Sequence, residues 1–493
     1  MTTGHTENRE VLAGAALDAA RAAGASYADV RINRYRSQYI GTREDRVLDI
    51  QDDDSFGFGV RVLCQGAWGF AASSVVTPDA LAQAARDAVA IARANAALQQ
   101  HPVELAPVRP QRDSWATPIR RDPFEVPLGE KVDLLLGLNR EALKAKGTKF
   151  CRSFLYAASE HKLFASTEGA LIAQDIHRIW PHFSVTAVSE DGGDFQSRDS
   201  LAAPMGRGYE WCEEAGLLDD ARRAGEDAVQ KLKSPGIEPG VRDLILMPSH
   251  LWLVIHESIG HATELDRALG FEANFAGTSF ATPDQLGKLQ YGSSLINVVG
   301  DRTEPGGLAT VGYDDEGVPA MRFDIIKDGV FVGYQTTREQ ARWVGDAASH
   351  ACSYADSYAS VPMQRMPNVS LLPGPAPLSP DDLIAGVDDG VLIHGNGSWS
   401  IDQQRRNFQF GGQVFHQIKN GKITGMLRDV AFQGTTPEFW NSCDAICSRE
   451  HYALGGSYYC GKAQPTQAAP VSHGSAPARF RRVTFLNTRR EAS

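Results

Sequence analysis

Three residues within a six-residue stretch, His256, Glu257 and His261, could together carry out metal-dependent hydrolysis. They lie in an apolar segment that follows the strand-like run of residues 244–247. Imidazole is a common zinc ligand, and a carboxylate beside it can act as a general base toward water. The segment therefore predicts a hydrolytic metal site in a buried helix, with a third ligand and substrate-binding groups supplied by other parts of the chain.

The spacing of the two histidines differs from that of the common zinc-protease helix. In that motif the histidines are four residues apart and share a face, whereas His256 and His261 are five apart. In a regular helix this offset separates the two side chains by about 140°. We therefore predict a π-bulge or a kink at or near Gly260, which would turn the second imidazole back. The alternative is a pair of histidines bonded to backbone carbonyl groups inside a core helix.

Several residues could supply the third ligand. The candidates are Cys460, Cys443, Cys447, His451, Glu264 and Asp266. Glu264 and Asp266 could instead orient an imidazole by accepting its second N–H. Cys460 lies in a glycine-flanked segment, which could place a thiolate against the helix. The residue chemistry alone does not choose among these candidates.

Other polar residues could assist the reaction. Candidates for a second electrophile are Arg365, Tyr313 and His350, although we favour a structural role for each of them. The acidic run Asp314, Asp315 and Glu316 could bind a substrate amine or a second metal. We favour a solvent-exposed hairpin turn there, because Gly317 follows directly.

The composition is that of a soluble globular protein with two or three domains. The 493 residues are 42% hydrophobic and 22% charged, and 49 basic against 60 acidic residues give a net charge of -11. We find no basic tract for nucleic acid, no membrane-spanning stretch and no secretion signal, so we expect a cytoplasmic protein without nucleic-acid or membrane partners. Seven cysteines, an odd number, form no dense disulfide framework.

Helical and strand-like patterns divide the chain into four segments. They are an amino-terminal helix/strand unit (1–98), a proline-rich linker (99–129), a middle helix/strand unit (130–235) and a β-rich catalytic domain (236–493). Thr77-Pro78-Asp79 is typical of a helix start, and Lys327-Asp-Gly and Lys419-Asn-Gly are typical of hairpin turns. The predicted class is α+β, with an amino-terminal α/β region of helix-flanked sheets and a carboxyl-terminal β-rich domain that carries the metal-binding helix.

Most of the chain resembles the TldD/PmbA family, and in particular its TldD-type metalloprotease subunit. The segments that carry the resemblance are Gly57-Phe-Gly-Val-Arg-Val-Leu, Gly66-Ala-Trp-Gly-Phe-Ala, His256-Glu-Ser-Ile-Gly-His, Asp314-Asp-Glu-Gly, Lys327-Asp-Gly-Val with Gly333-Tyr, Arg365-Met with Asn368, and Cys460-Gly-Lys. The resemblance implies Zn²⁺ held by His256, His261 and Cys460, with Glu257 as the general base. It also implies a two-subunit particle around an enclosed cavity, either a homodimer or a heterodimer with a PmbA/TldE-like subunit.

One segment departs from the family pattern. The family usually continues Cys-Gly-Lys with one residue and then Gly-Gln, and it has a glycine-rich apolar stretch before the last strand. This chain instead has Cys460-Gly-Lys-Ala-Gln-Pro and then Val471-Ser-His-Gly-Ser-Ala-Pro. We expect a zinc metallopeptidase that acts on unfolded or small peptides. The alternatives are a dedicated enzyme that processes one modified peptide or natural-product intermediate, and a non-catalytic subunit with a structural metal.

Overall fold

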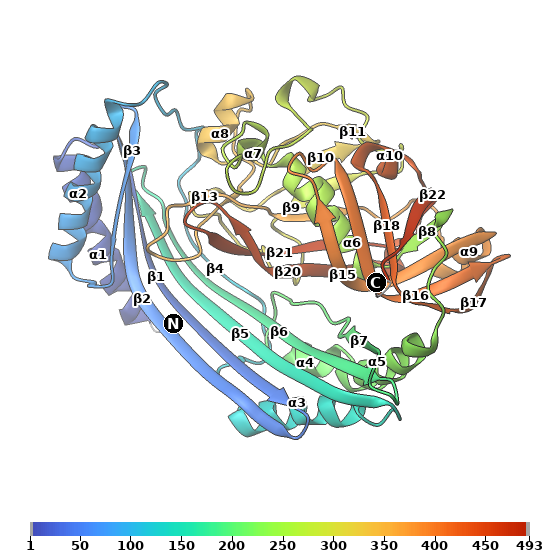
Figure 1. Cartoon of the computed structure of the whole chain (residues 1–493). Coiled ribbons are helices and arrows are strands. Elements are labelled where there is room, and N and C mark those ends of the chain that lie inside the picture. Colours follow the sequence, from blue (N-terminus) through green and yellow to red (C-terminus); the bar gives the residue numbers. More distant parts are fainter. Residues whose placement is uncertain (1–2, 490–493) are drawn as a thin grey trace.

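The computed structural model describes residues 3–489, and a long curved sheet forms its amino-terminal side (Figure 1). The strands of this sheet are β1 (Tyr27–Arg43), β2 (Arg46–Cys64), β3 (Ala67–Ser73), β4 (Arg112–Ala116), β5 (Thr148–Ser166), β6 (Leu171–Val188) and β7 (Phe195–Asp199). They are ordered β3-β2-β1-β5-β6-β4, with β7 beside β6. Because β1 pairs along its length with β5, the two predicted helix/strand units contribute to one continuous sheet.

Helices cover the outer face of this sheet (Figure 1). They are α1 (Thr3–Ala22), α2 (Pro78–Ala96), α3 (Leu128–Ala142), α4 (Glu210–Glu214) and α5 (Leu217–Lys233). The side chain of Thr77 accepts a hydrogen bond from the backbone N–H of Ala80, which confirms the predicted start of α2. Two separate apolar clusters lie beneath the helices, one under α1 and α2 and one under α3 and α5.

The proline-rich segment 99–129 is not wholly irregular. Its residues 112–116 form β4, which pairs in parallel with β6 from Leu171 to Asp175. This stretch contains no proline, so its backbone N–H groups are available for the ladder. The segment therefore adds an edge strand to the sheet that the two helix/strand units share.

The carboxyl-terminal domain lies on the inner side of the curved sheet and contains a closed barrel (Figure 1). The strands of its main sheet are β8 (Gly240–Leu246), β15 (Asp389–Ile401), β16 (Asn407–Lys419), β17 (Lys422–Leu427), β18 (Val430–Thr435), β19 (Cys443–Ile446) and β22 (Ala478–Asn487). They are ordered β15-β8-β22-β18-β16-β17, and β15 also pairs with β16, which closes the ring. The Lys419-Asn-Gly turn joins β16 to β17, as predicted.

Shorter strands and helices complete this domain. The strands are β9 (Val298–Asp301), β10 (Arg322–Lys327), β11 (Val330–Phe331), β12 (Ser353–Tyr354), β13 (Met363–Gln364), β14 (Asn368–Leu371), β20 (Ala453–Lys462) and β21 (Gln467–Ser475), and the helices are α6 (Pro248–Ile255), α7 (Leu265–Ala268), α8 (Arg338–Trp343), α9 (Pro380–Ala385) and α10 (Thr436–Asn441). The Lys327-Asp-Gly turn joins β10 to β11, again as predicted. The prediction of an α+β fold is confirmed.

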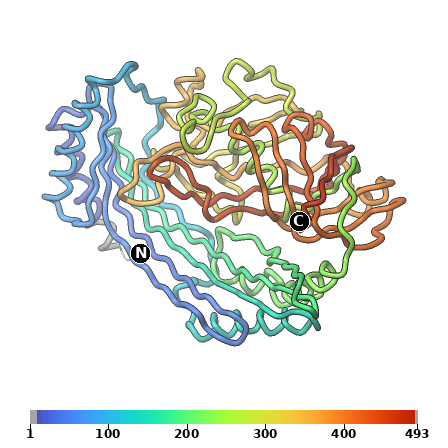
Figure 2. The backbone as a smooth tube through the Cα atoms, in the orientation of Figure 1, coloured from blue at the N-terminus to red at the C-terminus, as the bar shows by residue number. Residues whose placement is uncertain are grey.

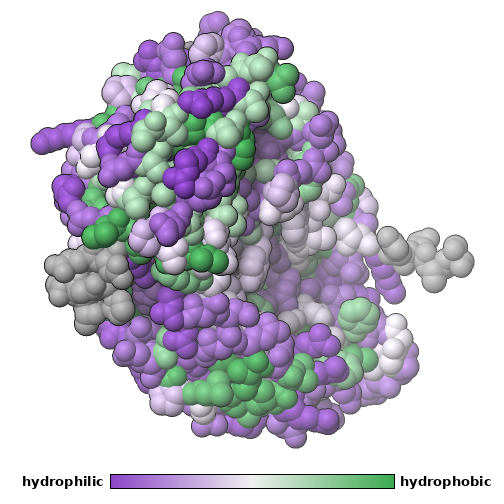
Figure 3. Space-filling model, turned by 90° about the vertical axis from the view of Figure 1, so that its left-hand side faces the viewer, coloured by the Kyte–Doolittle hydropathy of each residue, from purple (hydrophilic) through white to green (hydrophobic). Residues whose placement is uncertain are grey.

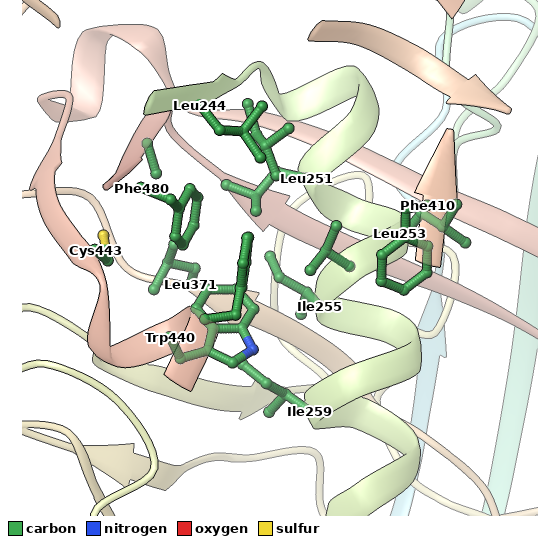
Figure 4. Packing of buried hydrophobic residues seen from close by; sticks show 14 of the residues in the cluster. Leu244, Leu251, Leu253, Ile255, Ile259, Leu371, Phe410, Trp440, Cys443 and Phe480 are labelled. Atoms are coloured by element: carbon green, nitrogen blue, oxygen red, sulfur yellow. The ribbon is translucent and has the colours of Figure 1, made fainter. Parts of the chain in front are cut away.

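Helix α6 runs through the core of the carboxyl-terminal domain, as Figure 4 shows. Its buried residues Leu251, Leu253 and Ile255 belong to a cluster that also contains Leu244 of β8 and Phe480 of β22. A helix that is apolar on nearly all sides is stable only when other elements surround it. This burial fixes the position of the residues that follow α6.

The hairpin β20–β21 extends from the barrel toward the long sheet, and Figure 2 shows its path beside β5 and β6. Polar side chains cover most of the face in Figure 3, with apolar side chains gathered in small groups between them. None of the helices formed by residues 3–489 is long and apolar enough to cross a membrane.

Candidate metal centre

His256, His261 and Cys460 come together just beyond the end of α6. One potential ligand atom from each of them lies within 4.8 Å of the other two. The sulfur of Cys460 is 3.7 Å from Nε2 of His261, although 199 residues separate them in sequence. All three side chains are buried. Among the side chains that the structure describes, those of residues 9–489, no other group of three His, Cys, Asp or Glu has this spacing.

The backbone from His256 to Gly260 is a π-helical turn, so the predicted distortion is confirmed. The N–H of His261 donates to the carbonyl of His256, a bond that spans five residues. The wider turn brings the two imidazole rings to a centroid distance of 4.6 Å. A Cβ atom on Gly260 would lie 2.4 Å from the sulfur of Met366, so close packing explains why this position is glycine.

A chain of hydrogen bonds determines which nitrogen of His256 faces the cluster. Nδ1 of His473 lies 2.7 Å from the carbonyl oxygen of Val369, which can only accept, so this nitrogen carries the hydrogen. Nε2 of His473 is then an acceptor, and Nδ1 of His256 donates to it over 2.7 Å. His256 therefore keeps a free lone pair on Nε2, the form in which histidine binds metals.

Glu264 accepts a hydrogen bond from Nδ1 of His261 and so leaves the lone pair on Nε2 of that ring free. Its Oε2 lies 2.9 Å from Nδ1 of His261 and 2.8 Å from Nε of Arg267, and its Oε1 lies 3.3 Å from Nζ of Lys462. Burial opposes ionisation of this carboxyl, but Lys462, Arg267 and His261 outweigh it and hold the pKa of Glu264 well below its usual range. Glu264 thus orients an imidazole, and Asp266 instead pairs with Lys462 at 2.7 Å.

The protonation states suit a metal. Burial lowers the pKa of His256 and of His261, so both rings are neutral at neutral pH. Burial disfavours the thiolate of Cys460, but the positive charge of His261, whenever that ring is protonated, and the charge of Arg365 outweigh it and lower the pKa of the thiol. Two neutral imidazoles and a thiolate are a donor set that fits zinc, so the residues present fit the metal that the resemblance implies.

The remaining ligand candidates lie elsewhere. Cys443 is packed in the apolar core near Phe480 (Figure 4), and burial raises the pKa of its thiol to about 12. Cys447 is also a core residue, and burial raises the pKa of its thiol to about 11. His451 lies in a short 3₁₀ turn that precedes β20. None of these three belongs to the cluster of ligand atoms.

The three candidates for a second electrophile do not line the cavity beside the cluster. Arg365 donates to the carbonyl groups of Gln467 and Cys460 and so holds the hairpin in place. The hydroxyl of Tyr313 donates to Asp113 over 2.6 Å. His350 stacks on a phenylalanine ring and bonds to a backbone carbonyl. Each of them has a structural role.

The acidic run Asp314 to Glu316 is buried, so our prediction of a solvent-exposed turn is wrong. Asp315 lies 3.2 Å from Nζ of Lys162 on β5, and Glu316 lies 3.1 Å from Arg61 on β2. Asp314 accepts hydrogen bonds from backbone N–H groups of its own turn. The turn is buried because the long sheet places basic side chains against it, which a local sequence pattern does not reveal.

A cavity of about 500 Å³ lies beside the cluster, between the carboxyl-terminal domain and the long sheet. Glu257 lines it, and its Oε2 lies 2.6 Å from Nη1 of Arg405. Arg405 also donates to the carbonyl of Ala276 over 3.0 Å. Our sequence analysis missed Arg405 and His473, because their partners Glu257 and His256 are 148 and 217 residues away and no local motif links them.

Three family models match nearly the whole chain. They are the PmbA/TldA metallopeptidase domain 1 (residues 28–92), the central domain (121–234) and the C-terminal domain (239–485). The chain belongs to the PmbA/TldD family. All three models describe metallopeptidase domains, so the chain is an enzyme that hydrolyses peptide bonds.

Curated relatives match over most of their length. A metalloprotease of Methanothermobacter thermautotrophicus is 28% identical over 94% of this chain and 96% of its own. A metalloprotease TldD homolog of Haemophilus influenzae is 27% identical over 88% of this chain and 87% of its own. A zinc metalloprotease TldD homolog of Saccharolobus solfataricus is 23% identical over 93% and 96%.

Solved structures share the PmbA/TldD fold. TldE from Thermococcus kodakarensis superposes with a TM-score of 0.69 at 15% identity, over 96% of this chain and 99% of its own. A putative modulator of DNA gyrase from Thermotoga maritima superposes with a TM-score of 0.74 at 15% identity, over 97% and 100%. These two structures therefore share the α+β fold of this chain over nearly its whole length.

Proposed function

We propose that this metallopeptidase uses a zinc ion held by His256, His261 and Cys460, with Glu257 as the general base. The observation that carries the proposal is the convergence of three ligand atoms within 4.8 Å at the wall of a cavity that Glu257 also lines. A purely structural zinc site has four protein ligands and is closed, whereas a catalytic site has three and an open position. The three-residue donor set beside a cavity supports the catalytic interpretation.

A bound zinc ion supplies Lewis acidity, which activates water and polarises a carbonyl group. Glu257 takes the proton from the attacking water and passes it to the leaving nitrogen. The bond from Arg405 occupies one carboxylate oxygen of Glu257 and fixes the direction of the other. Arg405 is thus proposed as a positioning residue for the base.

We propose unfolded or small peptides as substrates. A cavity of about 500 Å³ between two domains admits an extended segment of a few residues but not a folded domain. Main-chain hydrogen bonds to an extended segment would provide affinity with little dependence on sequence. We further propose assembly with a second subunit, either another copy or a PmbA/TldE-like chain, which the shared fold with TldE supports.

The test compares wild type with Glu257→Gln on a flexible peptide and on a folded protein of similar composition. Loss of the general base should lower cleavage of the peptide by about 10²- to 10⁴-fold while metal content stays unchanged. Glu450→Gln, which changes an exposed carboxylate in the same domain, is the matched control and should keep full activity. Undiminished cleavage by Glu257→Gln would overturn the mechanism, and equal cleavage of the folded protein would overturn the substrate class.

A further inference from the structure

Aromatic side chains from four separate elements surround the cavity beside the metal centre. They are Trp180 of β6, Trp252 of α6, Trp399 of β15 and Tyr459 of β20. Trp399 is 54% exposed and Tyr459 is 59% exposed. Burial of such rings against a ligand is favourable, because aromatic surface leaves water. The cavity thus presents unfilled aromatic surface next to Cys460 and Glu257.

Packing holds several of these rings in place before any ligand binds. Trp180 stacks on Tyr458 with an interplanar angle of 3° and meets Phe154 edge to face at 4.9 Å. Trp252 lies nearly parallel to the ring of His473, at an angle of 11°. A ligand that contacts such rings loses little free energy to ordering them. Trp180 and Trp252 are therefore a preformed part of the aromatic wall, which the four rings form together.

The charged groups of the cavity are largely engaged by the protein itself. Arg405 is the only lysine or arginine among the described residues that line it, and Arg405 is bonded to Glu257 and Ala276. Asp199 accepts a hydrogen bond from Gln413 over 3.1 Å. A buried charge without a partner is costly, so an acidic side chain or a terminal carboxylate of a substrate finds no free counter-charge here. The chemistry disfavours an acidic residue or the carboxyl terminus of a peptide at this position.

We propose that this aromatic wall is a specificity subsite for a large aromatic side chain next to the scissile bond of an internal amide. The proposal rests on the proposed function, because it assigns the substrate class of the same site. One well-matched apolar group in such a pocket changes kcat/KM by about 10- to 200-fold. The enzyme should therefore prefer peptides with Phe, Tyr or Trp beside the cleaved bond.

The test uses quenched fluorescent peptides with blocked ends and one variable residue on either side of the scissile bond. Peptides with Phe should be cleaved at least 10-fold faster, as kcat/KM, than those with Gly, Lys or Asp at the same position. Binding of the same peptides to the metal-loaded Glu257→Gln variant is measured in parallel. Equal binding of the Phe and Gly peptides, or tighter binding of the Lys or Asp peptide, overturns the subsite.

Two variants test whether the aromatic wall causes the preference for Phe peptides over Gly peptides. Trp399→Ala should reduce the Phe-over-Gly ratio toward unity, whereas Trp343→Ala, which removes a half-exposed ring of α8 outside the cavity, should leave it unchanged. An unchanged ratio in Trp399→Ala overturns the role of this ring. Selective binding without cleavage of any peptide supports the subsite and overturns the proposed hydrolysis, so the two failures are distinguishable.

Discussion

Two clusters of buried ionisable side chains differ in how their charges are balanced. At the junction between the long sheet and the carboxyl-terminal domain, Lys162 lies 3.0 Å from Glu160 and 3.2 Å from Asp315, so each charge has an opposite neighbour. At the candidate metal centre, the rings of His256 and His261 are neutral and the cluster gathers lone pairs around one point. Protein groups alone balance the charges of the first cluster, whereas the arrangement of the second cluster suits a bound cation.

The difference shows that burial and unusual pKa values do not by themselves mark a functional site. The pKa of Glu160 falls to about 2, because Arg178 and Lys162 outweigh the burial that opposes ionisation, yet its partners are all protein groups. The candidate metal centre differs in the two nitrogens of each histidine ring. Another protein group binds Nδ1 of His256 and of His261, while Nε2 of each ring faces the cluster of candidate ligand atoms.

The largest effect on stability is expected at the junction. Glu160→Gln leaves Arg178 without its carboxylate and Lys162 with Asp315 alone, and it should lower the free energy of unfolding by about 3–5 kcal/mol at pH 7. The folded-state pKa of Glu160 is below its unfolded value of about 4.3, so its contribution is present above pH 4.3 and is lost as the pH falls toward 2.

Denaturant unfolding of wild type and Glu160→Gln at pH 7 and at pH 3 checks this prediction. The gap in unfolding free energy should narrow at the lower pH, while the zinc content of the two folded proteins stays equal. A gap that is the same at both values, or a loss of zinc in the variant, would contradict the separation between the two clusters.

A smaller effect is expected at His473, which contacts the proposed metal ligand His256. His473→Phe keeps an aromatic ring beside Trp252 but removes the acceptor for Nδ1 of His256. Metal affinity, measured by competition with a chelator, should fall by about 10- to 100-fold. His250→Phe is the control, since His250 is equally buried but bonds only to the carbonyl of Gly395. Equal losses in both variants would remove His473 from its orienting role.

The smallest effect is expected at the π-helical turn. Gly260→Ala would push a methyl group against Met366 and should lower the free energy of unfolding by about 1–3 kcal/mol. Gly14→Ala in α1, where nothing lies within 4 Å of the added carbon, should leave stability unchanged or raise it by up to about 1 kcal/mol. Thermal unfolding of both variants measures the contrast, and a neutral Gly260→Ala would show that the turn tolerates a side chain.

The sequence predicts what is encoded locally. A five-residue offset between His256 and His261 predicts a distorted turn if both bind one metal, and Lys-Asp-Gly and Lys-Asn-Gly predict tight hairpins. The structure confirms the distorted turn and both hairpins. The burial of the run Asp314 to Glu316, and the contacts of Arg405 and His473, arise from packing between distant segments. Neither the hydrophobic periodicity of a segment nor the spacing of residues in a motif predicts contacts between distant segments.

The strand order of the amino-terminal sheet also depends on long-range pairing and cannot be predicted from local sequence patterns. Each helix/strand unit is readable from its own pattern, but the register between β1 and β5 joins residues more than a hundred positions apart. Strand pairing at that separation depends on side chains from both units and on the helices above them. The existence of the elements was therefore predictable, and their union in one sheet was not.

The most direct test of the metal centre is the zinc content of purified wild type beside Cys460→Ser. Cys443→Ser, which changes a buried cysteine of the apolar core outside the cluster, is the matched control. About one zinc per chain is expected in wild type and in Cys443→Ser, with most of it lost from a folded Cys460→Ser protein. Full zinc content in Cys460→Ser would contradict the account, because Cys460 would then not be a ligand.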